Sequence, residues 1–278
     1  AFPMGIDYEK YSGAVELPEV QKERDRVRQE VTTPKLILSV DRLDYSKGIP
    51  LRLKAFHRFL ERYPEYREHV TLMLIVAPSR TEVPQYRELK REIDELTSII
   101  NGDFGTIGWN PVWYYFRPAP FHQLSAIYAE SDMLLVTPLR DGMNLISKEY
   151  LAARSDRLGV VVLSETAGSA RELGEALTVN PNNIDEIADT IKEGLELPES
   201  RQIEKNDRMH MRLKRYDIHY WAHDFMQKLE GIAEVQNSLR VKRLSSETRG
   251  RIHERYRNSE HRVIFLDYDG TLIAYGET

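Results

Sequence analysis

Charged residues gather in three short stretches of the sequence, each of which directly follows an apolar run. Arg42 and Lys47 lie five residues apart in "DRLDYSKGIP", and Arg80 ends "APSR". Asp141 and Glu149 belong to the third stretch, "VTPLRDGMNLISKEYLAA". Arginine presents a planar fork to phosphate oxygens and lysine a mobile point charge, whereas carboxylates accept hydrogen bonds from sugar hydroxyls. These residue types therefore favour a ligand that carries both phosphates and hydroxyls, such as a nucleotide sugar.

The third stretch adds the start of a helix to these side chains. Helical spacing begins near Asn144, and a helix N-terminus leaves backbone N–H groups free to bind a diphosphate. Asp141 precedes Gly142, where the backbone can approach a ligand closely because glycine has no side chain. Glu149 lies about one turn beyond Leu145, within reach of ribose hydroxyls. Taken alone, each charged loop would more often be solvated surface, and Asp141–Gly142 signals only a turn.

The elements around these stretches alternate between strands and helices. Apolar runs predict strands at 35–40, 71–78, 111–116, 133–138, 159–165 and 176–180. Short apolar runs separated by amphipathic helices are typical of a parallel sheet. The predicted fold class is therefore α/β, a Rossmann-like parallel sheet with helices on both faces, followed by a helical tail. Ligands bind outside the carboxyl ends of the strands in such sheets, so the three charged stretches are expected on one rim.

The composition narrows the class of protein further. The 278 residues carry a formal net charge of −5, so no basic field favours nucleic acid. The chain contains no cysteine, which excludes disulfides and thiolate catalysis. No apolar run approaches the roughly 18 residues of a membrane span, and "AFPMGID" has no signal-peptide pattern. We expect a cytoplasmic protein that binds neither nucleic acid nor membrane, and both ends look like cuts in a longer polypeptide.

The charged stretches, together with "LSETAGSARELGEALTVNP", closely resemble the trehalose-6-phosphate synthases, retaining family 20 glycosyltransferases built from two Rossmann domains (GT-B). The resemblance runs from "FPMGID" to about residue 232. It implies transfer of glucose from UDP-glucose to glucose 6-phosphate, which gives trehalose 6-phosphate and UDP without a metal or other cofactor. The family's amino-terminal Rossmann domain is absent from this sequence. We therefore expect the donor-binding half, inactive by itself.

The resemblance also implies roles for individual residues. Arg42 and Lys47 would contact the donor diphosphate and, with Asp141, form the catalytic group, in which Asp141 holds glucose hydroxyls. Arg80 would bind the phosphate of glucose 6-phosphate, and the backbone near Ala119 would contact uracil. The remaining donor contacts are expected at Gly142, Met143, Asn144, Leu145, Ile146, Ser147, Lys148 and Glu149, the last of which would bind ribose.

The sequence departs from the family at two positions of "SETAGSA". Thr166 and Ser169 stand where the family usually has an aromatic residue and an alanine. These departures concern local packing and leave the predicted donor residues unchanged.

The end of the chain resembles a second family. "VIFLDYDGTL" matches the first motif of haloacid-dehalogenase-type phosphatases, in which Asp267 would be the nucleophile and Asp269 the acid/base. Mg²⁺ would be needed only by a complete phosphatase domain, and the other motifs of that fold are absent from this sequence. The predicted domains are 1–234 for UDP-glucose binding, 235–261 as a linker, and 262–278 as the beginning of the phosphatase domain.

Two other functions stay open at this point. One is a related UDP-glucose-dependent synthase with another acceptor, giving glucosylglycerol phosphate. The other is a non-catalytic regulatory subunit of a trehalose synthase complex, although such a subunit has no physical need for this set of charged residues. Assembly into a homo-oligomer or such a complex is compatible with either. His219 and His223 have a spacing that can bind zinc, but no third ligand accompanies them, so packing or surface roles are favoured.

Overall fold

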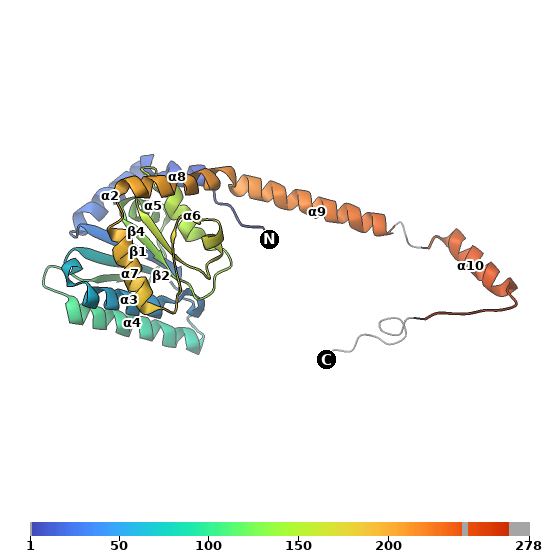
Figure 1. Cartoon of the computed structure of the whole chain (residues 1–278), viewed down its shortest axis with the longest axis horizontal. Helices are drawn as coiled ribbons and strands as arrows, with labels where there is room; N and C mark the ends of the chain where they lie inside the picture. The colour runs from blue at the N-terminus through green and yellow to red at the C-terminus, as the bar shows by residue number, and fades with distance from the viewer. Residues whose placement is uncertain (1, 241–243, 267–278) are drawn as a thin grey trace. The chain divides into compact units, whose positions relative to one another are not determined.

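The computed structural model describes residues 2–240 and 244–266 (Figure 1). The chain divides into two compact units, Ala1–Asp224 and Phe225–Thr278. The first unit is an α/β domain and contains every residue predicted for the donor and acceptor sites. Among the described residues, no helix is both long and apolar enough to cross a membrane.

Within the described residues, six parallel strands form one sheet. They are β1 (Lys35–Arg42), β2 (Val70–Ala77), β3 (Val112–Tyr115), β4 (Met133–Val136), β5 (Val160–Ser164) and β6 (Leu177–Val179). Every predicted strand of the sheet is present. Their order across the sheet is β3-β2-β1-β4-β5-β6. This order reverses direction between β1 and β4, and a parallel sheet opens a crevice for a ligand at such a topological switch point.

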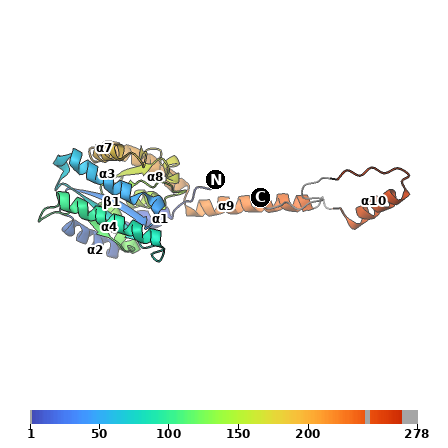
Figure 2. The same cartoon turned by 90° about the horizontal axis from the view of Figure 1, so that it is seen from below.

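Helices cover both faces of the sheet, as predicted. They are α1 (Tyr8–Ser12), α2 (Pro18–Glu30), α3 (Ile49–Arg62), α4 (Pro84–Phe104), α5 (Phe121–Glu130), α6 (Leu145–Ala153), α7 (Ile184–Leu195) and α8 (Glu199–Arg215), with α9 (Ile218–Arg240) beginning in the same unit. Figure 1 shows α3, α4 and α7 on one face and α2, α5, α6 and α8 on the other. Figure 2 shows α3 and α4 side by side along the first of these faces.

The alternation of side chains along β1 explains why both faces carry a core. Ile37 belongs to one buried apolar cluster, which includes Phe56 of α3. Leu36 and Leu38 belong to a second cluster, which includes Tyr150 of α6. Successive residues of a strand point to opposite faces, so a continuous apolar run such as "KLILSV" fills both clusters at once.

The second unit contains the carboxyl-terminal part of α9 and helix α10 (Ser246–Asn258). The hydroxyl of Ser245 accepts a hydrogen bond from the backbone N–H of Thr248 at 3.1 Å and thereby caps α10, which falls within the predicted linker. Residues 262–266, predicted to begin a strand, have no regular secondary structure and are exposed, because no strand of the described residues pairs with them. Asp267 and Asp269 lie outside the described residues.

Candidate active site

A cleft opens at the carboxyl ends of β1 and β4, where the strand order reverses. The predicted donor residues that line it are Arg42, Lys47, Ala119, Asp141, Met143, Asn144, Leu145 and Ile146. An apolar wall is added by Val40, Ile75, Ala77, Pro118 and Leu124. The fold thus brings the loop after β1, the loop after β4 and the segment before α5 to one place.

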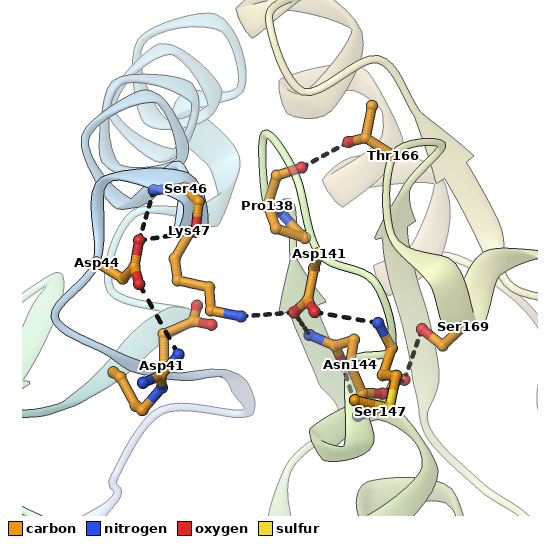
Figure 3. A network of polar contacts seen from close by, with 12 residues as sticks. Asp41, Asp44, Ser46, Lys47, Pro138, Asp141, Asn144, Ser147, Thr166 and Ser169 are labelled. Carbon is orange, nitrogen blue, oxygen red and sulfur yellow. Dashed lines mark hydrogen bonds and ion pairs between the residues drawn. The ribbon is translucent and has the colours of Figure 1, made fainter. Parts of the chain in front are cut away.

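Lys47 and Asp141 form an ion pair across the switch point (Figure 3). Lys47 Nζ lies 2.6 Å from Asp141 Oδ2, and the two side chains are only 14% and 12% exposed. Asp141 also accepts hydrogen bonds from the backbone N–H of Met143 and the amide of Asn144, both at 3.2 Å. Burial alone would raise the pKa of Asp141. The contact with Lys47, together with the hydrogen bonds from Met143 and Asn144, outweighs this effect and holds the pKa of Asp141 below its usual value. The site therefore presents an ionised carboxylate in a fixed position.

A tight turn after β1 holds Lys47 in place. The turn covers Tyr45–Lys47, and the carboxylate of Asp44 accepts hydrogen bonds from the backbone N–H and the hydroxyl of Ser46, at 2.9 and 2.7 Å. Gly48 follows with φ 66°, and a Cβ at this position would lie 2.6 Å from the carbonyl oxygen of Thr137. Only glycine therefore lets this turn approach the end of β4.

Arg42 lies at the rim of the cleft with more freedom than Lys47. Its side chain is 62% exposed, and its guanidinium lies 3.8 Å from the carboxylate of Asp44. Such a loose surface contact constrains a long side chain little. Arg42 is therefore free to move toward a bound anion.

A buried ion pair lies beneath the turn and was not predicted from the sequence. Arg52, in the first turn of α3, donates to Asp41 Oδ2 at 2.6 Å, and both side chains are almost completely buried. Burial raises the pKa of Asp41 although Arg52 opposes the shift. A signal did exist in the sequence, because Arg52 shares the apolar helical spacing of Ile49, Leu53 and Phe56.

The loop from Asp141 to Asn144 lies close against the turn Gly168–Arg171. Gly168 donates its N–H to the carbonyl of Asp141 at 2.7 Å, and a Cβ on Gly168 would lie only 2.1 Å from the carbonyl oxygen of Gly142. The space beside Gly142 itself is open. Gly168 therefore lets this turn pack against the loop that carries Asp141, and the close approach of a ligand at Gly142 stays a prediction.

Helix α6 starts just after Asn144, as predicted, and Asn144 is its N-cap. It adopts a left-handed conformation, φ 60°, and its side chain accepts a hydrogen bond from the N–H of Ser147 at 3.1 Å. The hydroxyl of Ser147 is buried against that of Ser169 at 3.0 Å, and Thr166 donates to the carbonyl of Pro138 at 2.7 Å. The side chains of Thr166 and Ser169, the two residues that depart from the family pattern, thus both have hydrogen-bond partners.

Lys148 and Glu149, one turn into α6, do not line the cleft. The ammonium of Lys148 is buried between the carboxylate of Glu172 at 2.8 Å and the carbonyl of Met4 at 2.9 Å. Glu149 accepts a hydrogen bond from the hydroxyl of Tyr128 at 3.1 Å. Burial raises the pKa of Glu149, although hydrogen bonds from Tyr11 and Tyr128 oppose this.

Arg80 also lies away from the cleft. It has a left-handed backbone, φ 48°, and its guanidinium lies 3.4 Å from the hydroxyl of Tyr86 on α4. The ring of Tyr86 makes an edge contact with the exposed ring of Tyr45, with centroids 6.1 Å apart. Arg80 therefore belongs to an aromatic cluster beside the turn that carries Lys47, rather than to the cleft itself.

No group of three or more His, Cys, Asp or Glu side chains in residues 2–240 and 244–266 is arranged to hold a metal ion. The positive groups at the cleft are those of Arg42 and Lys47, with the N-terminus of α6 beside them. The arrangement can bind an anion through these groups and hydroxyls through Asp141.

The fold and the cleft define a Rossmann-type α/β domain of the kind found in GT-B glycosyltransferases. More particularly, the chain belongs to glycosyltransferase family 20, because the family model matches residues 1–231.

Individual relatives agree with this assignment. A bifunctional trehalose-6-phosphate synthase/phosphatase from Thermoproteus tenax is 39% identical over 279 residues, covering 99% of this chain and 38% of the relative. A UDP-forming α,α-trehalose-phosphate synthase from Burkholderia xenovorans, solved with glucose-6-phosphate, has a TM-score of 0.80 at 34% identity and covers 83% of this chain and 51% of that one. A structure named "Trehalose-6-phosphate from E. coli bound with UDP-2-fluoro glucose" has a TM-score of 0.78 at 35% identity, covering 82% and 51%.

The chain thus spans 38% of the curated relative and about half of each solved structure.

Proposed function

We propose that this chain is the donor-binding half of an enzyme that transfers glucose from UDP-glucose to glucose 6-phosphate, giving trehalose 6-phosphate and UDP. The observation that carries the proposal is the Lys47–Asp141 pair, which places a cation and a carboxylate side by side at the switch point of a family 20 domain. The solved relatives support the two substrates, since one holds glucose-6-phosphate and another a UDP-glucose analogue.

In this proposal the donor diphosphate lies between Arg42, Lys47 and the start of α6. Lys47 exchanges part of its contact with Asp141 for a phosphate oxygen, and the mobile side chain of Arg42 closes on the diphosphate from the rim. These positive groups offset the negative charge that develops on the departing UDP. We therefore expect glucosyl transfer to require no metal ion.

The two ends of the donor would meet different surfaces. Asp141 would accept hydrogen bonds from glucose hydroxyls, because the bonds from Met143 and Asn144 keep its carboxylate in place. The uracil would lie at the other end, against the backbone near Ala119 and the apolar side chain of Ile75. A cleft lined by both charged and apolar side chains suits a nucleotide sugar.

Two measurements test the proposal. Calorimetry on this chain should detect binding of UDP and UDP-glucose, and a non-catalytic subunit that has lost the site would bind neither. With the full-length protein, UDP release should depend on glucose 6-phosphate. Release that depends instead on glycerol 3-phosphate would identify the related synthase with another acceptor. The chain alone should bind donor but not turn over.

The role of Glu149 gives the first prediction. If its carboxylate accepts ribose hydroxyls, Glu149→Gln should weaken UDP binding about fivefold, because a charge-assisted acceptor becomes a neutral one. Binding of 2′,3′-dideoxy-UDP should stay close to that of the parent chain, since this ligand lacks the hydroxyls. If calorimetry finds that both ligands lose the same affinity, Glu149 supports the fold and does not contact the ribose.

Glu149 also predicts a pH dependence. Burial raises its pKa from the ordinary 4.5, so the carboxylate takes up a proton at a higher pH than an ordinary glutamate does. The protonated form is a poorer acceptor for ribose hydroxyls. UDP binding should therefore weaken as the pH falls through this raised pKa. The titration of UDP itself cancels when the parent is compared with Glu149→Gln, and identical pH profiles for the two chains would contradict this prediction.

Three further features are part of the proposal. The motif that contains Asp267 and Asp269 is proposed to begin a Mg²⁺-dependent phosphatase domain, which agrees with the bifunctional relative that aligns over 99% of this chain.

Association into a homo-oligomer or a trehalose synthase complex stays a prediction that the solution mass of the full-length protein tests. Cytoplasmic location is likewise a prediction, which imaging of the tagged full-length protein tests.

A further inference from the structure

Arg52 makes hydrogen bonds on both sides of the switch point, to β1 and the turn after β1 and to the end of β4. Its guanidinium donates to Asp41 on β1 at 2.6 Å, to the hydroxyl of Thr137 just after β4 at 3.1 Å, and to the carbonyl of Lys47 at 2.9 Å. The hydroxyl of Ser39 is a further acceptor, at 2.5 Å. Arg52 therefore holds β1, the turn after β1 and the end of β4 in one arrangement, although it does not line the cleft.

The charge of Arg52 matters because two carboxylates face Lys47. Asp41 and Asp141 both line the cleft beside Lys47. Arg52 neutralises Asp41, and the ammonium of Lys47 contacts Asp141. Without Arg52 the buried Asp41 would have no paired cation of its own, and a buried unpaired charge is strongly unfavourable. Lys47 would then be drawn from the cleft toward Asp41.

We propose that Arg52 is a positioning residue of the donor site. Its guanidinium hydrogen-bonds to the backbone carbonyl of Lys47 and pairs with the carboxylate of Asp41, so that the ammonium of Lys47 stays available to the diphosphate. This inference rests on the proposed function, because it concerns the same bound ligand. Arg52 touches no substrate in the proposal and acts only through Lys47.

The test compares two buried arginines of this chain. Arg52→Met keeps most of the side-chain volume and removes the guanidinium, and it should weaken UDP binding about tenfold. The control is Arg154→Met. Arg154 is also buried and donates to the carbonyls of Ala129 and Ser131 at 2.8 and 2.7 Å, at the far end of α6. Both variants should unfold at a lower temperature, but only Arg52→Met should lose UDP affinity. Equal losses of affinity would overturn the inference.

A double variant shows whether Arg52 acts through Lys47. Once Lys47→Ala has removed the ammonium, adding Arg52→Met should weaken UDP binding by less than a factor of two. No ammonium is left to be drawn away, and Asp41, whose pKa burial already raises, takes up a proton instead of repelling the ligand. A full second tenfold loss would mean that Arg52 acts independently of Lys47, and the inference would be wrong.

Arg52→Lys covers the case in which Arg52→Met does not fold. Lysine keeps a positive charge beside Asp41, but its single ammonium cannot replace the planar fork that reaches Thr137 and Lys47 together. We expect UDP binding several-fold weaker than in the parent, and parent-like affinity would overturn the inference. Failure of the proposed function is distinct, because the parent chain itself would then bind no UDP.

Discussion

Replacement of Lys47 by alanine should weaken UDP binding roughly ten- to hundredfold, at the upper end of what one charge-assisted contact contributes. Two effects combine in this variant. The diphosphate loses a largely buried cation, and Asp141, which is only 12% exposed, loses its partner and repels the ligand. Arg42→Ala should cost less, about tenfold, because Arg42 lies at an exposed rim and leaves no buried charge behind. Calorimetry of the three chains at one ionic strength gives the comparison.

The double variant Lys47→Ala/Asp141→Asn separates the two effects. Removing the charge of Asp141 should restore part of the UDP affinity lost in Lys47→Ala, because the repulsion disappears while the lost cation does not return. The unfolding temperatures of all variants show whether each chain is folded under the conditions of measurement. Unchanged UDP affinity in both Lys47→Ala and Arg42→Ala would mean that the diphosphate binds elsewhere.

Replacement of Arg80 by alanine should raise the apparent KM for glucose 6-phosphate by one to two orders of magnitude in the full-length enzyme. A dianionic phosphate held by a guanidinium loses a strong paired contact, and only a ligand with that phosphate is affected. The guanidinium of Arg80 lies 3.4 Å from the hydroxyl of Tyr86, a long contact for a hydrogen bond, so it can leave this contact for a phosphate at little cost. The KM for UDP-glucose should change little.

Unphosphorylated glucose provides the control for Arg80→Ala. It is expected to be a poor acceptor for both enzymes and should be used equally by the variant and the parent. A variant that loses affinity for UDP-glucose, yet keeps its preference for the phosphorylated acceptor, would place Arg80 in the donor site. Steady-state assays of UDP release with each acceptor distinguish these outcomes.

The local elements of this protein could be predicted from its amino-acid sequence. Apolar runs such as 133–138 predict their strands, and Asn144 before an apolar helical pattern predicts the start of α6, because side-chain periodicity and capping depend only on near neighbours in the chain. The charged residues that follow each strand could also be located in this way. The resemblance to family 20 rested on such local stretches, and the family match over residues 1–231 confirms it.

Which of these residues contact one another depends on the folding of the whole chain. β1 pairs with β4 although β2 and β3 lie between them in the chain, and this pairing places Lys47 within 2.6 Å of Asp141. The same packing buries Arg52 beneath the turn and directs Lys148 toward Glu172, away from the cleft. Periodicity shows that a residue is on an apolar face or at a strand end, but not which distant segment packs there. Strand order and the buried ion pairs depend on contacts between residues far apart in the sequence, so only the folded chain reveals them.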